Sequence, residues 1–163
     1  MTNAAAHLGA RLGRRTVAVA ESCTGGLITS ALAAEPGSGV WFRGALVAYQ
    51  RDVKFELLRV TPGPVVSTRA AAEMAIGVAA LLHADVAVAV TGAAGPDPHD
   101  GAQPGTVIIA VAVDGETTVR EYFFAGPPSA VLEKACTHAL RDLGNSLVAR
   151  SGVNESRTAP RRA

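Results

Sequence analysis

Two short apolar runs constrain the fold of this chain more than any other feature. Residues 16–20 read TVAVA, and residues 85–92 read DVAVAVTG. Both are rich in β-branched valine and have few polar residues, which is typical of strands in a sheet that is covered on both faces. Each run leads into a segment with glycines, so each predicts a buried strand that ends at a loop.

The rest of the chain predicts helices, one further strand at 40–49, and one hairpin. The runs TVIIAVAV (106–113) and TVREYFF (118–124), joined around Asp114-Gly115, predict that hairpin. Alternating strands and helices with a hairpin favour the α/β class, namely a three-layer α/β/α sandwich with a mixed β-sheet. The segments with a helical pattern are 7–12, 24–35, 51–60, 65–84 and 128–149.

The length of 163 residues suits a single domain with a sizeable core. We expect that domain to span residues 1–150 and the polar residues 151–163 to form a disordered tail. Hydrophobic residues make up 48% of the chain but aromatic residues only 4%. Since alanine and valine then fill most of the core, we expect helices that pack closely on the sheet.

Two helices carry start signals. Thr24 is the expected N-cap of the helix at 24–35, and Ser67 or Thr68 is expected to cap the helix at 65–84. The longer helix has its predicted buried face at Ala71, Met74, Val78 and Leu81.

The charge and the cysteines exclude several function classes. The formal net charge of +1 gives no electrostatic basis for binding nucleic acid. Two cysteines make neither a disulfide framework nor a zinc site. We find no secretory signal and no apolar run of membrane length, so we expect a soluble cytoplasmic protein without a membrane partner. Apolar helices in a small domain make a homo-oligomer plausible.

The segment ESCTGG (21–26), after the first strand, has two interpretations. Free amides at a helix N-terminus can bind phosphate or stabilise an oxyanion, and either Ser22 or Cys23 could act as a nucleophile. Alternatively, the segment only caps a helix. It is not a phosphate-binding P-loop, since no lysine follows the glycines, and it lacks the G-x-S-x-G spacing.

The segment AYQRDVK (48–54) places Tyr49 at a strand end and Lys54 five residues later. A lysine that is partly removed from water has a lowered pKa and can deprotonate a serine, and a nearby tyrosine can relay the proton. The alternative is a solvated surface lysine. The chain has only one other lysine, Lys134, so its exposed cations are nearly all arginines.

The segment VTGAAGP could present Thr91 and glycine amides to a ligand, or it could be a simple turn after a strand. It opens the loop 93–105, which is long enough to indicate a functional or mobile segment. Asp97, His99 and Asp100 lie in that loop but do not make a closed ligand set. We therefore expect no metal and no cofactor.

Five stretches, in this order, resemble the CinA C-terminal domain family. The family's characterised members include the PncC-type nicotinamide-nucleotide amidohydrolases (NMN deamidases). The resemblance implies a three-layer α/β/α fold in a stand-alone form and a cytoplasmic hydrolase that converts nicotinamide mononucleotide (NMN) to nicotinate mononucleotide and ammonia. The matching stretches are AESCTGG, PGSGVWFRGALVAYQRDVK, VSTRAAAEMA, DVAVAVTGAAGP and GTVIIAVA.

The resemblance also implies roles for individual residues. Ser22 would be the nucleophile, Lys54 the general base, and Tyr49 a proton relay or an orienting group. Cys23 would turn toward the core. The residues expected to line the substrate site are Thr24, Gly25, Gly26, Thr91 and Gly92, with amides near Gly25 and Gly26 as oxyanion donors.

The chain departs from the family's pattern at two places. After Gly126 the family has polar residues, including an arginine near the start of the last helix, whereas this chain has Pro127, Pro128 and Leu132. If that arginine grips the NMN phosphate, its loss weakens binding about ten- to a hundredfold. The family also often has Ser-Asn where this chain has Gln50-Arg51, and Arg51 is a candidate replacement for the phosphate contact.

These departures leave two further functions open. The chain could be a catalytically silent module that binds a nucleotide or serves a competence-related interaction. It could also be an amidase for a different small amide that uses the same serine and lysine.

Overall fold

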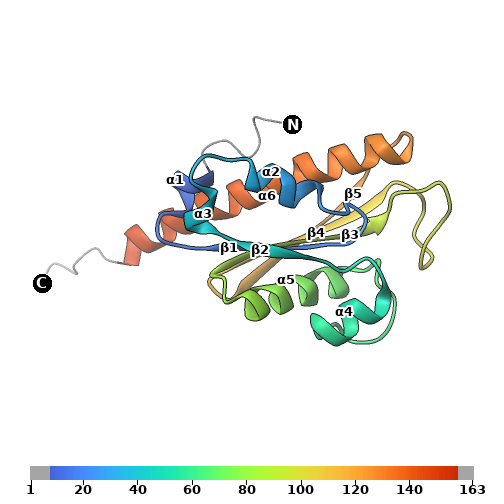
Figure 1. The fold of residues 1–163 in the computed structure, drawn as a ribbon, viewed down its shortest axis with the longest axis horizontal. Helices are drawn as coiled ribbons and strands as arrows, with labels where there is room; N and C mark the ends of the chain where they lie inside the picture. Colours follow the sequence, from blue (N-terminus) through green and yellow to red (C-terminus); the bar gives the residue numbers. More distant parts are fainter. Residues whose placement is uncertain (1–7, 158–163) are drawn as a thin grey trace, which may run out of the picture.

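The computed structural model describes residues 8–157 of the chain, and the side chains of residues 8–149. It forms three layers, with a five-stranded sheet between helices on both faces (Figure 1). The predicted three-layer α/β/α sandwich with a mixed sheet is therefore confirmed. The elements are α1 (Leu8–Leu12), β1 (Val17–Glu21), α2 (Leu27–Ala33), α3 (Ser38–Trp41), β2 (Phe42–Val47), α4 (Arg51–Leu57), α5 (Thr68–Leu82), β3 (Val86–Ala93), β4 (Thr106–Val113), β5 (Glu116–Phe123) and α6 (Pro128–Arg157).

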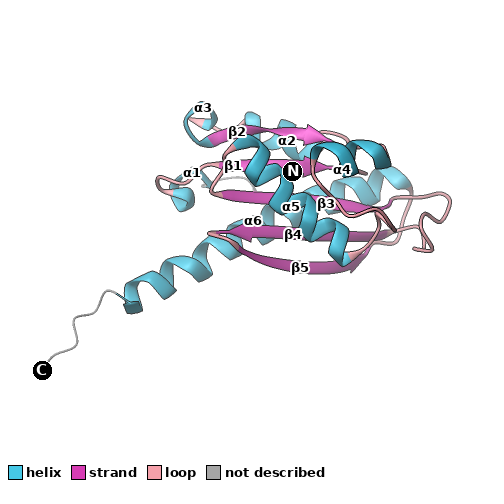
Figure 2. Cartoon of the chain, turned by 90° about the horizontal axis from the view of Figure 1, so that it is seen from below, coloured by secondary structure: helices cyan, strands magenta, loops and turns pink. Residues whose placement is uncertain are grey.

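The strand order is β2-β1-β3-β4-β5, as Figure 2 shows from the α5 side. β1 pairs in parallel with both β2 and β3, while β4 and β5 add an antiparallel hairpin beyond β3. In the register, Glu21 lies opposite Val47 on one side and Val90 on the other. The carboxyl ends of three parallel strands therefore meet at one edge of the sheet, where ligand sites form in such folds.

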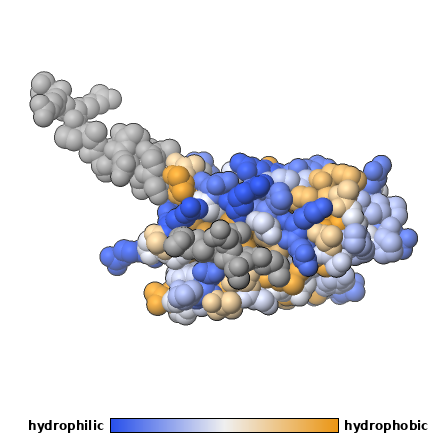
Figure 3. Space-filling view, turned by 90° about the horizontal axis from the view of Figure 1, so that it is seen from above, coloured by the Kyte–Doolittle hydropathy of each residue, from blue (hydrophilic) through white to orange (hydrophobic). Residues whose placement is uncertain are grey.

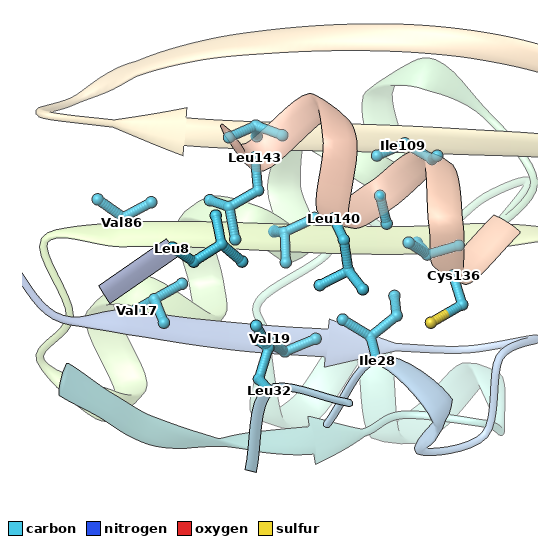
Figure 4. Close-up of a cluster of buried hydrophobic side chains, with 14 of the residues drawn as sticks. Leu8, Val17, Val19, Ile28, Leu32, Val86, Ile109, Cys136, Leu140 and Leu143 are labelled. Atoms are coloured by element: carbon cyan, nitrogen blue, oxygen red, sulfur yellow. The ribbon is translucent and has the colours of Figure 1, made fainter. Parts of the chain in front are cut away.

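The alternation of valine and alanine along the central strands decides what each face of the sheet packs against. Val17 and Val19 of β1 belong to the core under α1, α2 and α6, whereas Ala18 and Ala20 belong to the core under α5. Small side chains on the α5 face allow that helix to approach the sheet closely. Figure 4 shows the bulkier core, where Ile28 and Leu32 of α2 and Leu140 and Leu143 of α6 cover β1 and β3.

Some sequence predictions of element boundaries are wrong. Residues 38–41 form the helical turn α3, which brings Trp41 into the core, so the strand predicted from residue 40 begins at Phe42. The last helix, predicted over residues 128–149, continues to Arg157. Hydrophilic residues cover much of the face on which α6 lies (Figure 3).

The helix caps were predicted with mixed success. Ser67 caps α5 and accepts a hydrogen bond from the Ala70 amide, as predicted. Thr24 does not cap α2, whose N-cap is Gly26. Leu81 is 46% exposed, although Ala71, Met74 and Val78 are buried. Leu81 points in nearly the same direction as the buried Met74, but it lies in the last turn of α5, which ends at Leu82.

Candidate active site

A cavity of about 460 Å³ lies at the carboxyl ends of β1, β2 and β3. Its volume is in the range of small-molecule sites. It brings together four of the predicted site residues, but Lys54, Arg51, Thr24, Gly25 and Gly26 are not among the residues that line it. The lining residues are Ser22, Cys23, Tyr49, Gln50, Val65, Val66, Thr91, Gly92, residues 93–99, Pro128 and Leu132.

Ser22 is held at the end of β1 by its backbone. Its amide donates to Val90 O at 3.0 Å, which extends the pairing with β3, and its carbonyl accepts from the Gly25 amide at 3.1 Å. Gly25 and Gly26 have φ values of +57° and +108°, which disfavour any side chain and explain the glycine pair. The turn therefore presents Ser22 and Cys23 to the cavity at a fixed position.

Glu21, which the sequence analysis overlooked, organises this turn. Its fully buried carboxylate accepts from the amides of Gly26 (3.0 Å), Ile28 (3.2 Å) and Thr29 (2.8 Å), and from the Thr29 hydroxyl. The carboxylate thus caps α2 in place of Thr24. The sequence contained a signal for this role, namely an acidic residue at the end of a predicted buried strand. A buried carboxylate requires hydrogen-bond donors, and the nearest donors are the amides of the helix that follows.

The capping by Glu21 corrects the predicted oxyanion donors. The Gly26 amide is bonded to the carboxylate and the Gly25 amide to Ser22 O, so neither faces the cavity as a free donor. Within residues 8–157, the amides of Cys23 and Thr24 donate to no backbone carbonyl. These two amides, which also face the Cys23 sulfur, are the remaining candidates for binding an oxyanion next to Ser22.

Cys23 packs against the core, as predicted, but it also lines the cavity. Burial raises the pKa of its thiol to about 12, although the amides of Cys23 and Thr24 and the charge of Lys54 lower it. The group is therefore a neutral thiol at neutral pH. A cysteine nucleophile has to be a thiolate, which argues against Cys23 in that role.

Lys54 is 1% exposed, so the alternative of a solvated surface lysine is wrong. Its Nζ donates to Ala48 O at 2.6 Å and to Tyr49 O at 3.0 Å. Burial lowers the pKa of Lys54 to about 8, with a further lowering by the positive charge of Arg51. Near pH 8 a large fraction of the amine is neutral, and a neutral amine that donates two N–H bonds keeps its lone pair free.

No direct hydrogen bond joins the three residues that were predicted to act together. Among residues 8–149, neither Ser22 Oγ nor the Tyr49 phenol bonds to Lys54 Nζ. The Tyr49 side chain is 66% exposed at the rim of the cavity. Lys54 is instead linked to Tyr49 through the backbone carbonyl of that residue.

Thr91 and Gly92 line the cavity as predicted, but both have structural partners. The Thr91 hydroxyl donates to Val65 O at 2.7 Å. A Cβ atom on Gly92 would lie 2.5 Å from Thr106 O, so close packing of β3 against β4 already explains this glycine. The Thr24 hydroxyl is buried with no hydrogen-bond partner among the described residues.

Arg51 is paired with Asp100 of the loop 93–105 and does not line the cavity. The other carboxylate oxygen of Asp100 accepts from the amides of Val65 (2.6 Å) and Val66 (3.3 Å). These contacts hold the loop against the start of α4, next to the stretch 95–99 that forms one cavity wall. In the described part of the chain, no group of three or more His, Cys, Asp or Glu side chains could hold a metal ion.

Helix α6 contributes Pro128 and Leu132 to the cavity wall, beside Gly95 of the loop 93–105. These are two of the three residues after Gly126 at which the sequence departs from the family's pattern, so that departure lies at the cavity. None of the helices in residues 8–157 is both long and apolar enough to cross a membrane.

Comparisons with known proteins agree with the resemblance. The family model of the CinA C-terminal domain matches residues 2–147. A CinA-like protein of Thermosynechococcus vestitus is 43% identical over 120 residues, which are 69% of this chain and 29% of that protein. A CinA-like protein of Mycobacterium tuberculosis is 40% identical over 140 residues, 82% of this chain and 33% of that protein. The chain thus spans about a third of the length of these relatives.

Solved structures match over nearly the whole chain. A competence or damage-inducible protein from Enterobacter asburiae has a TM-score of 0.86 and 32% identity, covering 90% of this chain and 97% of its own. A competence/damage inducible protein from Agrobacterium tumefaciens has a TM-score of 0.83 and 30% identity, covering 90% and 94%.

Proposed function

Since the chain belongs to the CinA C-terminal domain family, we propose that it is an amidohydrolase that uses Ser22 as its nucleophile. NMN is the substrate that the family implies, and its products would be nicotinate mononucleotide and ammonia. The observation that carries the proposal is the buried Lys54, whose pKa is lowered to about 8 next to the turn that presents Ser22. A perturbed lysine beside a cavity is characteristic of a catalytic base.

In the proposed reaction, the Ser22 hydroxyl attacks the carboxamide carbon while neutral Lys54 takes the hydroxyl proton. The tetrahedral intermediate collapses, the C–N bond breaks, and the proton held by Lys54 passes to the leaving nitrogen as ammonia departs. Water then attacks the Ser22 ester with Lys54 again as base, which releases the carboxylate and restores the serine. Tyr49, at the rim, is available to orient the ring or the leaving group.

The amides of Cys23 and Thr24 would stabilise the oxyanion of this intermediate. An amide that directly follows the nucleophile is used in this way at other sharp turns after a strand. The raised pKa of the Cys23 thiol supports Ser22 as the nucleophile, because a protonated thiol is a poor nucleophile.

The test is ammonia release from NMN by the purified protein and by three variants. Ser22→Ala is expected to lower kcat by about a thousandfold or more, and Lys54→Met by a similar factor. Lys134→Met, which removes an exposed lysine, is the matched control and should retain full activity. Because the neutral amine is required, kcat/KM should rise with pH up to about 8. Full activity of Ser22→Ala would refute the mechanism.

A catalytically silent binding module is the second candidate function. It is favoured by the absence, among residues 8–149, of a hydrogen bond between Ser22 and Lys54, and by the apolar wall at Pro128 and Leu132. Calorimetric binding of NMN without any turnover by the wild-type protein would support this alternative over the amidohydrolase.

A further inference from the structure

The walls of the cavity carry little positive charge. Within residues 8–149, no lysine or arginine side chain lines it. The lining contains one acidic side chain, Asp97, and one histidine, His99. A phosphate monoester has a charge of about −1.5 to −2 at pH 7 and needs cations or several N–H donors when it leaves water.

The nearest cations outside the lining are already engaged. Lys54 Nζ donates to the carbonyls of Ala48 and Tyr49. The Arg51 guanidinium is paired with Asp100 and also donates to Gly63 O at 3.3 Å. A phosphate that recruited Arg51 would have to displace a carboxylate that is itself bonded to two backbone amides.

The N-terminus of α6 could ordinarily bind a phosphate in place of a cationic side chain, because the first amides of a long helix form an anion site. Here Pro127 and Pro128 have no N–H groups at all. The amides of Ala130 and Val131 donate to Pro127 O at 3.0 and 3.1 Å. Among residues 127–131, only the Ser129 amide donates to no carbonyl oxygen. The adjoining cavity wall at Leu132 is apolar.

From this distribution of charge we propose that the site selects a carboxamide without a phosphate group, namely a pyridinium nucleoside rather than a nucleotide. A pyridinium ring carries a positive charge, which Asp97 would attract, and the nucleoside lacks the dianion for which the described lining offers no lysine or arginine side chain. This inference rests on the proposed amidohydrolase chemistry for the reaction and narrows the class of its substrate.

The experiment compares nicotinamide riboside with NMN, two carboxamides that differ only in the phosphate. Ammonia release by the wild-type protein should give a kcat/KM at least about tenfold higher for the riboside. Leu132→Arg places a cation on the α6 wall and should shift the ratio toward NMN by about ten- to a hundredfold. Leu81→Arg, on an exposed part of α5, is the matched control and should leave the ratio unchanged.

Equal or better turnover of NMN by the wild-type protein would overturn the proposal. An unchanged ratio in Leu132→Arg would refute the role of the α6 wall. If neither compound releases ammonia, the amidohydrolase itself is refuted, and calorimetry with Ser22→Ala then decides the ligand class separately. Binding of the riboside but not of NMN supports the inference in that case, whereas equal binding, or no binding of either compound, contradicts it.

Discussion

The buried lysine should make the stability of this protein depend on pH in an unusual direction. The pKa of Lys54 is lowered from 10.5 to about 8 in the folded chain, chiefly by burial. Between these two values the unfolded chain holds a proton that the folded chain has lost. Unfolding therefore takes up a proton in this window, and the free energy of unfolding rises with pH. Below pH 8 the folded protein bears the full cost of a buried cation.

The size of the effect follows from the displacement of the pKa. One pKa unit corresponds to about 1.4 kcal/mol, so the complete cost is about 3 kcal/mol, of which about 2.5 kcal/mol is relieved between pH 7 and pH 10. Lys54→Met removes the titrating group while keeping much of its length. The free energy of unfolding of wild type minus that of Lys54→Met should therefore increase by about 2.5 kcal/mol across this range.

The assay is urea denaturation of both proteins at half-unit steps from pH 7 to pH 10, with all other titrating groups cancelling in the difference. Lys134→Met provides the control for removal of a lysine that is exposed, and its difference from wild type should not follow the same curve. A flat difference between wild type and Lys54→Met would show that Lys54 titrates alike in both states. Such a result would argue against Lys54 as the general base.

Three further outcomes follow from the site. Glu21→Ala should lower the free energy of unfolding by about 3–5 kcal/mol in denaturant, because it leaves three amides and a hydroxyl without their acceptor. Gly92→Ala should cost about 1–3 kcal/mol, since the new Cβ would lie 2.5 Å from Thr106 O, while Gly39→Ala, which meets open space, should cost much less. Cys23 should react only slowly with iodoacetamide at pH 7.5, and fast alkylation of the folded protein would contradict its raised pKa.

The layers of the fold could be predicted because they depend on local patterns. The valine-alanine alternation of β1 and β3 indicates strands with two buried faces, and Asp114-Gly115 indicates the hairpin, where both residues have positive φ. The helical turn at Ser38–Trp41 could not be predicted in this way. Its apolar residues fit a strand equally well, and only the position of Trp41 in the core distinguishes the two.

Parts of the site depended on contacts that no local pattern contains. The sequence placed Ser22, Tyr49, Thr91 and Gly92 at the ends of parallel strands, and the cavity includes all four. Arg51 was a candidate for the phosphate because a charge near a site suggests a ligand. Its partner in the structure is Asp100, forty-nine positions away in the chain, and such a pairing requires knowledge of where the loop 93–105 lies.

Glu21 shows why a helix N-terminus alone does not define an anion site. In the sequence, the glycines of ESCTGG suggested free amides at the start of α2, but the first residue of the same segment, Glu21, supplies a carboxylate to three of these amides. A negative charge buried at that point would repel a second anion bound to the same helix end. The amides that remain are those of Cys23 and Thr24 in the turn beside Ser22, where the proposed reaction would develop the negative charge of an oxyanion.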